Sequence, residues 1–333
     1  MKIKKEYIIL FVVIVVLATY LTIDQSDRTH YQLPVIPDIS QADVTKLLIS
    51  DNDYKIELVK KANTWLVQPE NYLADSSKMK TMLNAIEKIT LTALVSESET
   101  YERYDLGDDK KINVTAWAGE SEKRKFDIGK TASSNQHTFI RLDADNRIFH
   151  ARGNLRSAFD LTIEQLRDKS VLTFEKDGIK EITVSENGES MMLSLKETEA
   201  ANEKPDEIKD KEKKDAVSSE KKIERTWMDP DGKPLDESKI SGLISVVSNL
   251  KCESYIDRKT KADFKDMKAL YTVQLDGEKT YSLTIFNKET ESAKSYPGIS
   301  SENDYPFVLP EWKVDSIKTN IEDLNKKKSD TDK

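Results

Sequence analysis

The chain has 333 residues, of which 37% are hydrophobic and 34% are charged, and its formal net charge at pH 7 is −8. Nucleic acid and anionic phospholipid headgroups need clustered Lys and Arg, so an acidic chain is not expected to have either as its main partner. The single cysteine, Cys252, excludes an internal disulfide framework, and a small buried side chain is the simpler interpretation of it than a reactive thiol.

The N-terminus carries a targeting signal. Three lysines within residues 1–6 precede an apolar run at residues 7–23, and a helix over this run spans roughly 26 Å, enough for a thin bilayer core. A cleaved signal peptide is the alternative, but residues 18–21 offer no pair of small residues at cleavage-site spacing. We predict a single-pass anchor in the cytoplasmic (inner) membrane. By the positive-inside rule, residues 1–6 lie in the cytoplasm and the bulk of the chain is periplasmic or extracellular.

Short alternating runs follow the anchor. Residues 24–43 are expected to form an extended tether, because Pro34 and Pro37 exclude a helix. The first module is predicted at residues 44–175. Alternation typical of strands occurs at residues 44–49, 54–58, 64–67, 91–95, 112–117, 125–128, 138–141 and 147–150. A helix with a single apolar face follows Asp75, and a second one is expected from Leu155 towards Leu166.

One stretch of this module is repeated later in the sequence. The first copy contains Trp65, Pro69 and Asp75, and the second contains Trp227, Pro230 and Asp236. Pro69 and Asp75 both recur 161 residues later, and both copies continue with apolar residues at helical spacing. The aspartates stand where a helix N-cap belongs. Their equal positions predict that the tryptophans are core residues rather than platforms for a ligand.

The second module is predicted at residues 176–325 and repeats the order of elements of the first. Within it, residues 196–224 carry mixed charge and few apolar side chains, so they are expected to be a disordered insertion. Residues 326–333 form a polar tail. The predicted fold class is α+β, with an N-terminal transmembrane helix and two tandem repeated modules, each a mostly antiparallel sheet with an amphipathic helix.

The chain shows no catalytic signature. His30, His137 and His150 do not have metal-ligand spacing, and no serine lies in a Gly-x-Ser-x-Gly elbow. We therefore expect no metal, no cofactor and no enzymatic activity. Exposed aromatic residues in loops of the second module offer the best candidate contact surface. These residues are Tyr296, Tyr305 and Phe307.

A series of short motifs runs through the first module in a fixed order. The motifs are Trp65-x3-Pro69, Asp75 before a helix, Tyr104-Asp-Leu106, Phe126-x-Ile128-Gly129-Lys130, Phe139-Ile140-Arg141, Ile148-Phe149 and Leu166-Arg167-Asp168-Lys169. Together they resemble the bacterial "domain of unknown function 4340" family, best over residues 44–200. The resemblance implies a membrane-anchored protein, often a neighbour of auxiliary components of gliding-motility-type ABC transporters. It brings no catalytic residues.

These observations favour a non-enzymatic envelope protein with a protein partner, acting as a scaffold or accessory binding component of a membrane complex such as an ABC-type transporter. One alternative is an envelope hydrolase acting on glycan or peptide, with its site between the modules. Another is a solute- or polymer-binding module. Perturbed carboxylates or a Ser/His pair in a deep cleft would favour the enzyme, and a shallow apolar patch would favour the scaffold.

Overall fold

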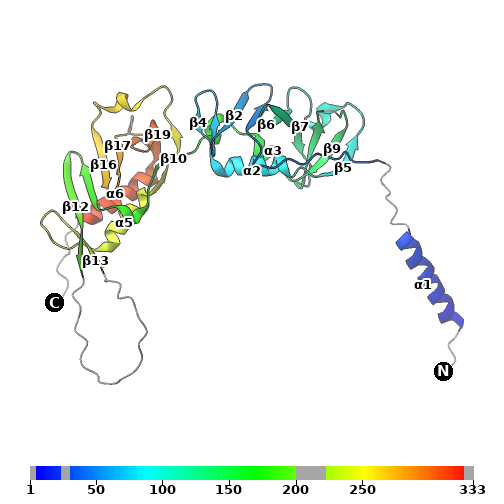
Figure 1. Cartoon of the computed structure of the whole chain (residues 1–333), viewed down its shortest axis with the longest axis horizontal. Coiled ribbons are helices and arrows are strands. Elements are labelled where there is room, and N and C mark those ends of the chain that lie inside the picture. The colour runs from blue at the N-terminus through cyan, green and yellow to red at the C-terminus, as the bar shows by residue number, and fades with distance from the viewer. Residues whose placement is uncertain (1–4, 24–30, 144, 200–222, 326–333) are drawn as a thin grey trace, which may run out of the picture. The chain divides into compact units, whose positions relative to one another are not determined.

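The computed structural model describes residues 5–23, 31–143, 145–199 and 223–325. The chain divides into two compact units, Met1–Asp168 and Lys169–Lys333. Each unit is built on one large antiparallel sheet with few helices (Figure 1). The fold class is therefore α+β, as the short alternating runs predict.

The first unit contains a nine-stranded sheet in the order β4-β3-β2-β1-β6-β7-β8-β9-β5. Its strands are β1 (Lys46–Ser50), β2 (Lys55–Lys61), β3 (Thr64–Val67), β4 (Tyr72–Leu73), β5 (Leu91–Ser96), β6 (Ile112–Ala118), β7 (Ser121–Thr131), β8 (His137–Leu142) and β9 (Ile148–Arg152). Its helices are α2 (Ser76–Glu87), α3 (Arg156–Phe159) and α4 (Ile163–Leu166), with a 3-10 turn η1 (Tyr101–Tyr104).

One face of this sheet is apolar and is covered by helices. Leu47 and Phe126 are buried in a core that also contains Met82 and Ile86 of α2. Successive side chains on a strand point to opposite faces, so the alternating polar residues lie on the other face of the sheet. We call this second face the open face. Helix α2 begins as predicted, because the side chain of Asp75 accepts hydrogen bonds from the first backbone N–H groups.

The second unit contains an eight-stranded sheet in the order β13-β12-β11-β16-β17-β18-β19-β15. Its strands are β11 (Glu181–Glu186), β12 (Glu189–Glu199), β13 (Ile223–Met228), β15 (Ser254–Tyr255), β16 (Ala269–Asp276), β17 (Thr280–Phe286), β18 (Ser295–Ser300) and β19 (Asn303–Pro310). Strands β10 (Ser170–Thr173) and β14 (Asn249–Lys251) form a separate pair. The other elements are η2 (Lys176–Gly178), η3 (Lys261–Phe264), α5 (Glu237–Val247) and α6 (Glu311–Asn325).

The second sheet follows the order of the first, with β13, β12 and β11 in the places of β3, β2 and β1, and β16 to β19 in the places of β6 to β9. Helix α5 stands in the place of α2, and the side chain of Asp236 accepts from the backbone N–H of Ser238. This order matches the tandem repeat expected from the sequence.

The closing helix differs between the units. In the second unit it is one helix, α6, as expected. The single helix predicted from Leu155 towards Leu166 is wrong, because α3 and α4 are separate and the chain restarts at Thr162. The hydroxyl of Thr162 accepts from the backbone N–H of Gln165, whose side chain accepts from the backbone N–H of Thr162. Such a capping box begins a new helix.

Along the chain, the first unit ends at Asp168 and the second begins at Lys169. This boundary is earlier than the one between residues 175 and 176 that is expected from the sequence. The reason is pairing: β10 hydrogen-bonds to β14, which belongs to the second unit. Strand β10, which the sequence assigns to the end of the first module, therefore belongs to the second unit.

The ends of the predicted disordered insertion at residues 196–224 are ordered strands. Glu197 lies opposite Arg225 in the β12–β13 ladder, and the two side chains form an ion pair of 3.1 Å. Paired backbone groups thus order residues that composition alone assigns to a solvated segment. Residues 200–222 of the insertion lie outside the described residues, as do residues 1–4, residues 24–30 of the tether and the tail at 326–333.

Residues Lys5–Ile23 form helix α1. Among the residues that the structure describes, no helix meets the length and apolarity needed to cross a membrane. The predicted anchor at residues 7–23 therefore rests on the sequence.

The last part of the predicted tether is folded onto the first unit. Ile39 is buried in the first core, and Leu33 packs against that core. The buried guanidinium of Arg124 donates to the carbonyl oxygens of Pro37 and Ile86. Burial lowers the pKa of Arg124, and the negative charge of Asp38 opposes this shift. The carbonyl of Ile86 belongs to the last turn of α2, where the helix dipole favours a cation.

Arg124→Met is expected to release this segment. The methionine keeps an apolar stem but leaves two carbonyl oxygens without their charged donor. Limited proteolysis should cut between residues 31 and 43 faster in the variant than in the parent, with the first unit otherwise intact. A matched change of an exposed neighbour, Lys123→Met, should leave the cleavage rate unchanged. Equal rates for all three proteins would contradict the role assigned to Arg124.

An ion network on the open face of the first sheet

The two repeat tryptophans occupy matching core positions. Trp65 is 8% exposed in the first core and Trp227 is 7% exposed in the second. The backbone carbonyl of Trp65 accepts from the N–H of Ala74 at 2.9 Å, and that of Trp227 accepts from the N–H of Leu235 at 2.8 Å. Pro69 and Pro230 both lie in the turn that follows the tryptophan strand. These positions make the repeat signature a structural one.

The aromatic residues predicted as a loop surface lie on strands instead. Tyr296 is on β18, and Tyr305 and Phe307 are on β19. Phe307 is fully buried, and its ring fits against Gly298, where a Cβ atom would lie 2.8 Å from the ring. The glycine that looks like a loop residue thus makes room for a core side chain.

Only part of that predicted surface is accessible. Tyr305 is 38% exposed, while Tyr296 is half-buried and lines a hollow of about 440 Å³ with Tyr271 and Lys288. The ammonium nitrogen of Lys288 lies 4.9 Å from the centre of the Tyr296 ring. Burial raises the pKa of Tyr271 to about 12, so this phenol stays neutral.

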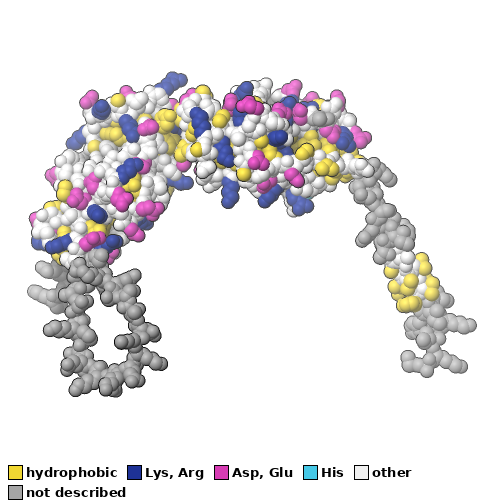
Figure 2. All heavy atoms as spheres, in the orientation of Figure 1, with side chains coloured by type: hydrophobic (Ala, Val, Ile, Leu, Met, Phe, Trp, Pro, Cys, Tyr) yellow, Lys and Arg dark blue, Asp and Glu magenta, His cyan; other side chains and the backbone are white. Residues whose placement is uncertain are grey.

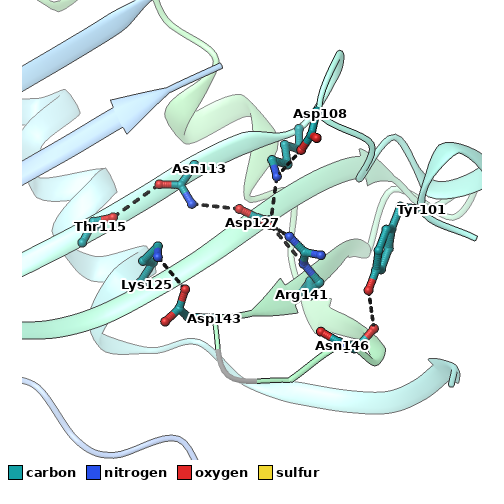
Figure 3. A network of polar contacts seen from close by, with 10 residues as sticks. Tyr101, Asp108, Asn113, Thr115, Lys125, Asp127, Arg141, Asp143 and Asn146 are labelled. Atoms are coloured by element: carbon teal, nitrogen blue, oxygen red, sulfur yellow. Dashed lines mark hydrogen bonds and ion pairs between the residues drawn. The ribbon is translucent and has the colours of Figure 1, made fainter. Parts of the chain in front are cut away.

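The most organised polar group in the first unit surrounds Asp127 (Figure 3). Asp127 lies on β7 and is 5% exposed. It accepts from Asn113 on β6 at 2.8 Å and from two nitrogens of Arg141 on β8 at 3.1 and 2.5 Å. The ammonium of Lys111 approaches it at 3.8 Å. The register places Asn113, Asp127 and Arg141 opposite one another, so they form one row across three strands.

The loop that precedes β6 closes over this row. The ring of Tyr101 in η1 lies 4.6 Å from the guanidinium carbon of Arg141, and its hydroxyl donates to the backbone carbonyl of Asn146 at 3.2 Å (Figure 3). Lys111 also pairs with Asp108 of the same loop at 2.6 Å. A cation held over an aromatic face is attractive, and more so when it is partly desolvated. The network therefore fixes the loop on the open face of the sheet.

A second row on this face is aromatic. The rings of Tyr104 and Phe139 are 4.9 Å apart, Phe139 and His150 are 4.7 Å apart, and His150 stacks on His137 at 5.4 Å. The Nε2 atom of His150 is buried and has no hydrogen-bond partner among the described residues. Burial lowers the pKa of His150, and repulsion from His137 lowers it further. The neutral imidazole is thus the form that the fold favours.

Acid should destabilise the protein through His150. Its pKa is lower in the folded state than the ordinary value near 6.5, so below about pH 6.5 the unfolded chain binds the proton that the folded chain resists. The free energy of unfolding should therefore fall as the pH drops from 7.5 to 5.5, and His150→Val should show a shallower fall. His137→Gln should keep most of the slope, since burial is the larger cause. Identical slopes in parent and His150→Val, measured by denaturant unfolding, would refute this.

The ion network belongs to the first unit and is not repeated at the matching positions of the second. There, Val273 lies opposite Leu283, as Val114 lies opposite Phe126. Counting along the ladders places Thr272, Thr284 and Ile299 where the first unit has Asn113, Asp127 and Arg141. The same count places Val308 in the position of His150. The fold is repeated, but this ion network is not.

The protein is thus a tandem α+β protein with two related sheet units. The first unit carries a row of charged residues and a row of aromatic residues on the open face of its sheet. Comparison with protein families matches residues 65–270 to the family described as Domain of unknown function (DUF4340). The chain belongs to this family. Comparisons with curated proteins and with solved structures gave no match.

Proposed function

We propose that this protein is a non-enzymatic, membrane-anchored scaffold or accessory binding component of an envelope complex, such as an ABC-type transporter. The observation that carries the proposal is the difference between the two units. A structural network would be expected at the same place in both copies, whereas the row around Asp127 occurs in one. The carboxylate of Asp127 is already engaged by Asn113 and Arg141, which suits it to ordering a surface.

The surface that this network orders offers the groups that protein interfaces use. Tyr and Arg are enriched where binding energy concentrates. Tyr101, Tyr104 and Arg141 are all half-buried, so part of each remains accessible beside the open sheet face. Basic and acidic side chains are interspersed over the visible faces of both units (Figure 2). Such a surface favours a protein partner with mixed polar and aromatic contacts over a partner of uniform charge.

A photocrosslinking amino acid placed in turn at two matched positions tests this function. Lys125 lies beside Asp127 on the open face of the first unit, and Ser282 holds the same register position in the second. In cells, the probe at position 125 should give a discrete adduct whose partner, identified by mass spectrometry, is an envelope membrane protein. The probe at 282 should not give that adduct. Absence of an adduct from position 125, or the same adduct from both positions, would contradict the proposal.

We also propose that residues 7–23 hold the chain in the cytoplasmic membrane with the two units outside the cytoplasm. The support is the apolar run after three lysines, and the physical reason is the positive-inside rule. A reporter enzyme that works only in the cytoplasm, fused after Lys333, should be inactive. Replacing residues 2–5 by a neutral sequence should weaken this bias. Strong reporter activity from the parent fusion would overturn the topology.

A further inference from the structure

A hollow of about 350 Å³ lies in the first unit, at the edge where β3 and β4 meet helix α2. Its walls are mainly apolar and include Trp65 of β3, Leu73 of β4, and Met79 and Leu83 of α2. Leu73 is 47% exposed, which is high for a leucine beside a core. The volume falls within the range of small ligand-binding clefts. We call this hollow the β3–α2 groove.

The second unit has a larger side chain at one of the positions that line this groove. Ala74 lines the β3–α2 groove, and Leu235 stands in its place in the second unit, as the matching backbone bonds to Trp65 and Trp227 show. Leu235 packs against the second core, which contains Trp227 and Ile240. The second unit thus places its own leucine beside its tryptophan, whereas the first has only a methyl group there.

We propose that the β3–α2 groove binds an aliphatic side chain, of leucine type, from an extended segment of a partner protein. The chemistry of the occupant is the one that the second unit uses internally: a branched aliphatic side chain on a non-helical backbone, next to a tryptophan. Burying such a side chain strengthens binding by roughly tenfold to a hundredfold. The site is separate from the Asp127 face and does not depend on the function proposed above.

The rim of the groove suits a peptide backbone. Asn63, Thr64 and Ser76 place amide and hydroxyl groups around the apolar walls. These groups can donate to and accept from the backbone of a bound segment, which fixes its direction while the apolar wall selects the side chain. Lys80 and Asp168 also line the groove and give it one charge of each sign, so the rim does not select a segment by its net charge.

The test uses the full-length chain in detergent and a phage-displayed library of random dodecapeptides as the probe. Selected peptides should share an aliphatic residue, and changing that residue to glycine should lower affinity at least tenfold. Ala74→Leu should fill the groove from within and cause a similar loss. It should melt like the parent, because the fold already accepts leucine at the equivalent position of the second unit.

Two further variants keep the test decisive. Ser76→Trp blocks the mouth of the groove from an exposed position and should also abolish binding, whether or not Ala74→Leu folds. Glu237→Trp, at the matching exposed position of α5, is the control and should bind as the parent does. The proposal is overturned if no peptide is enriched, if enriched peptides lack an aliphatic residue, or if they bind Ser76→Trp as well as the parent. If peptides bind but a probe at position 125 gives no adduct, the proposal for the β3–α2 groove is kept and the proposed role of the Asp127 face is rejected.

Discussion

Trp65→Ala is expected to lower the free energy of unfolding of the first unit by about 3–5 kcal/mol while leaving the second unit folded. The side chain is 8% exposed and belongs to the first core, so truncation loses its buried surface and leaves a cavity. Trp227→Ala should do the reverse, since Trp227 belongs to the second core. Each unit has its own core, so damage in one need not spread to the other.

The measurement is denaturant unfolding of a fragment covering residues 31–333, followed by probes specific to each unit. The fragment starts at residue 31 because the segment held by Arg124 belongs to the first fold. Trp117→Ala, at a half-buried position on the open face, is the control and should cost much less. If both core variants unfold like the parent, the tryptophans are not core residues and become candidates for ligand contact.

Asp127→Thr is expected to destabilise the first unit by about 3 kcal/mol, because it leaves the partly buried guanidinium of Arg141 without its carboxylate. The second unit supplies the compensating change. It has Thr284 and Ile299 at these positions, so Asp127→Thr combined with Arg141→Ile should recover most of the loss. Removing both members of a buried pair is much less costly than removing one.

A double-mutant cycle measures this coupling directly. Arg141→Ile alone should also be destabilising, because it leaves Asp127 buried with only Asn113 and the more distant Lys111. Thr284→Ala in the second unit is the matched control and should change stability little. Additive losses in the double variant would show that the two side chains do not act as a pair. The single variants should also loosen the loop held by Tyr101, which hydrogen exchange at residues 97–111 would report.

Most strands of the first unit and the N-caps of α2 and α5 follow from short-range sequence patterns. Alternation fixes which side chains of a strand share a face, and an aspartate before an amphipathic run fixes a helix start, because both depend on neighbours within a turn or two. The repeat also indicated that Trp65 and Trp227 occupy equivalent positions in the two units. The same patterns failed at Tyr305 and Phe307, where proline and glycine suggested loops. These residues lie on strands, and Gly298 leaves room for the buried ring of Phe307.

The ion network could not be predicted in this way. Asp127 and Arg141 sit at polar positions of their strands, where a charged residue is normally solvated, and nothing in either strand indicates the other. One signal was present in the sequence: both lie inside the family-like motifs of the first unit and have no charged counterpart in the second. Recognising it requires the strand register, which aligns the two copies residue by residue.

The sequence by itself therefore determined most of the elements, the duplication and the faces of the predicted strands, because these are set by local periodicity. Only the tertiary structure decided which side chains meet. Strand neighbours fix the register that joins Asn113, Asp127 and Arg141. The packing around Trp65 and Ala74 leaves the β3–α2 groove open. The buried guanidinium of Arg124 holds the end of the tether against the first unit. Such contacts join residues far apart in the chain, and their energies depend on burial that no local pattern records.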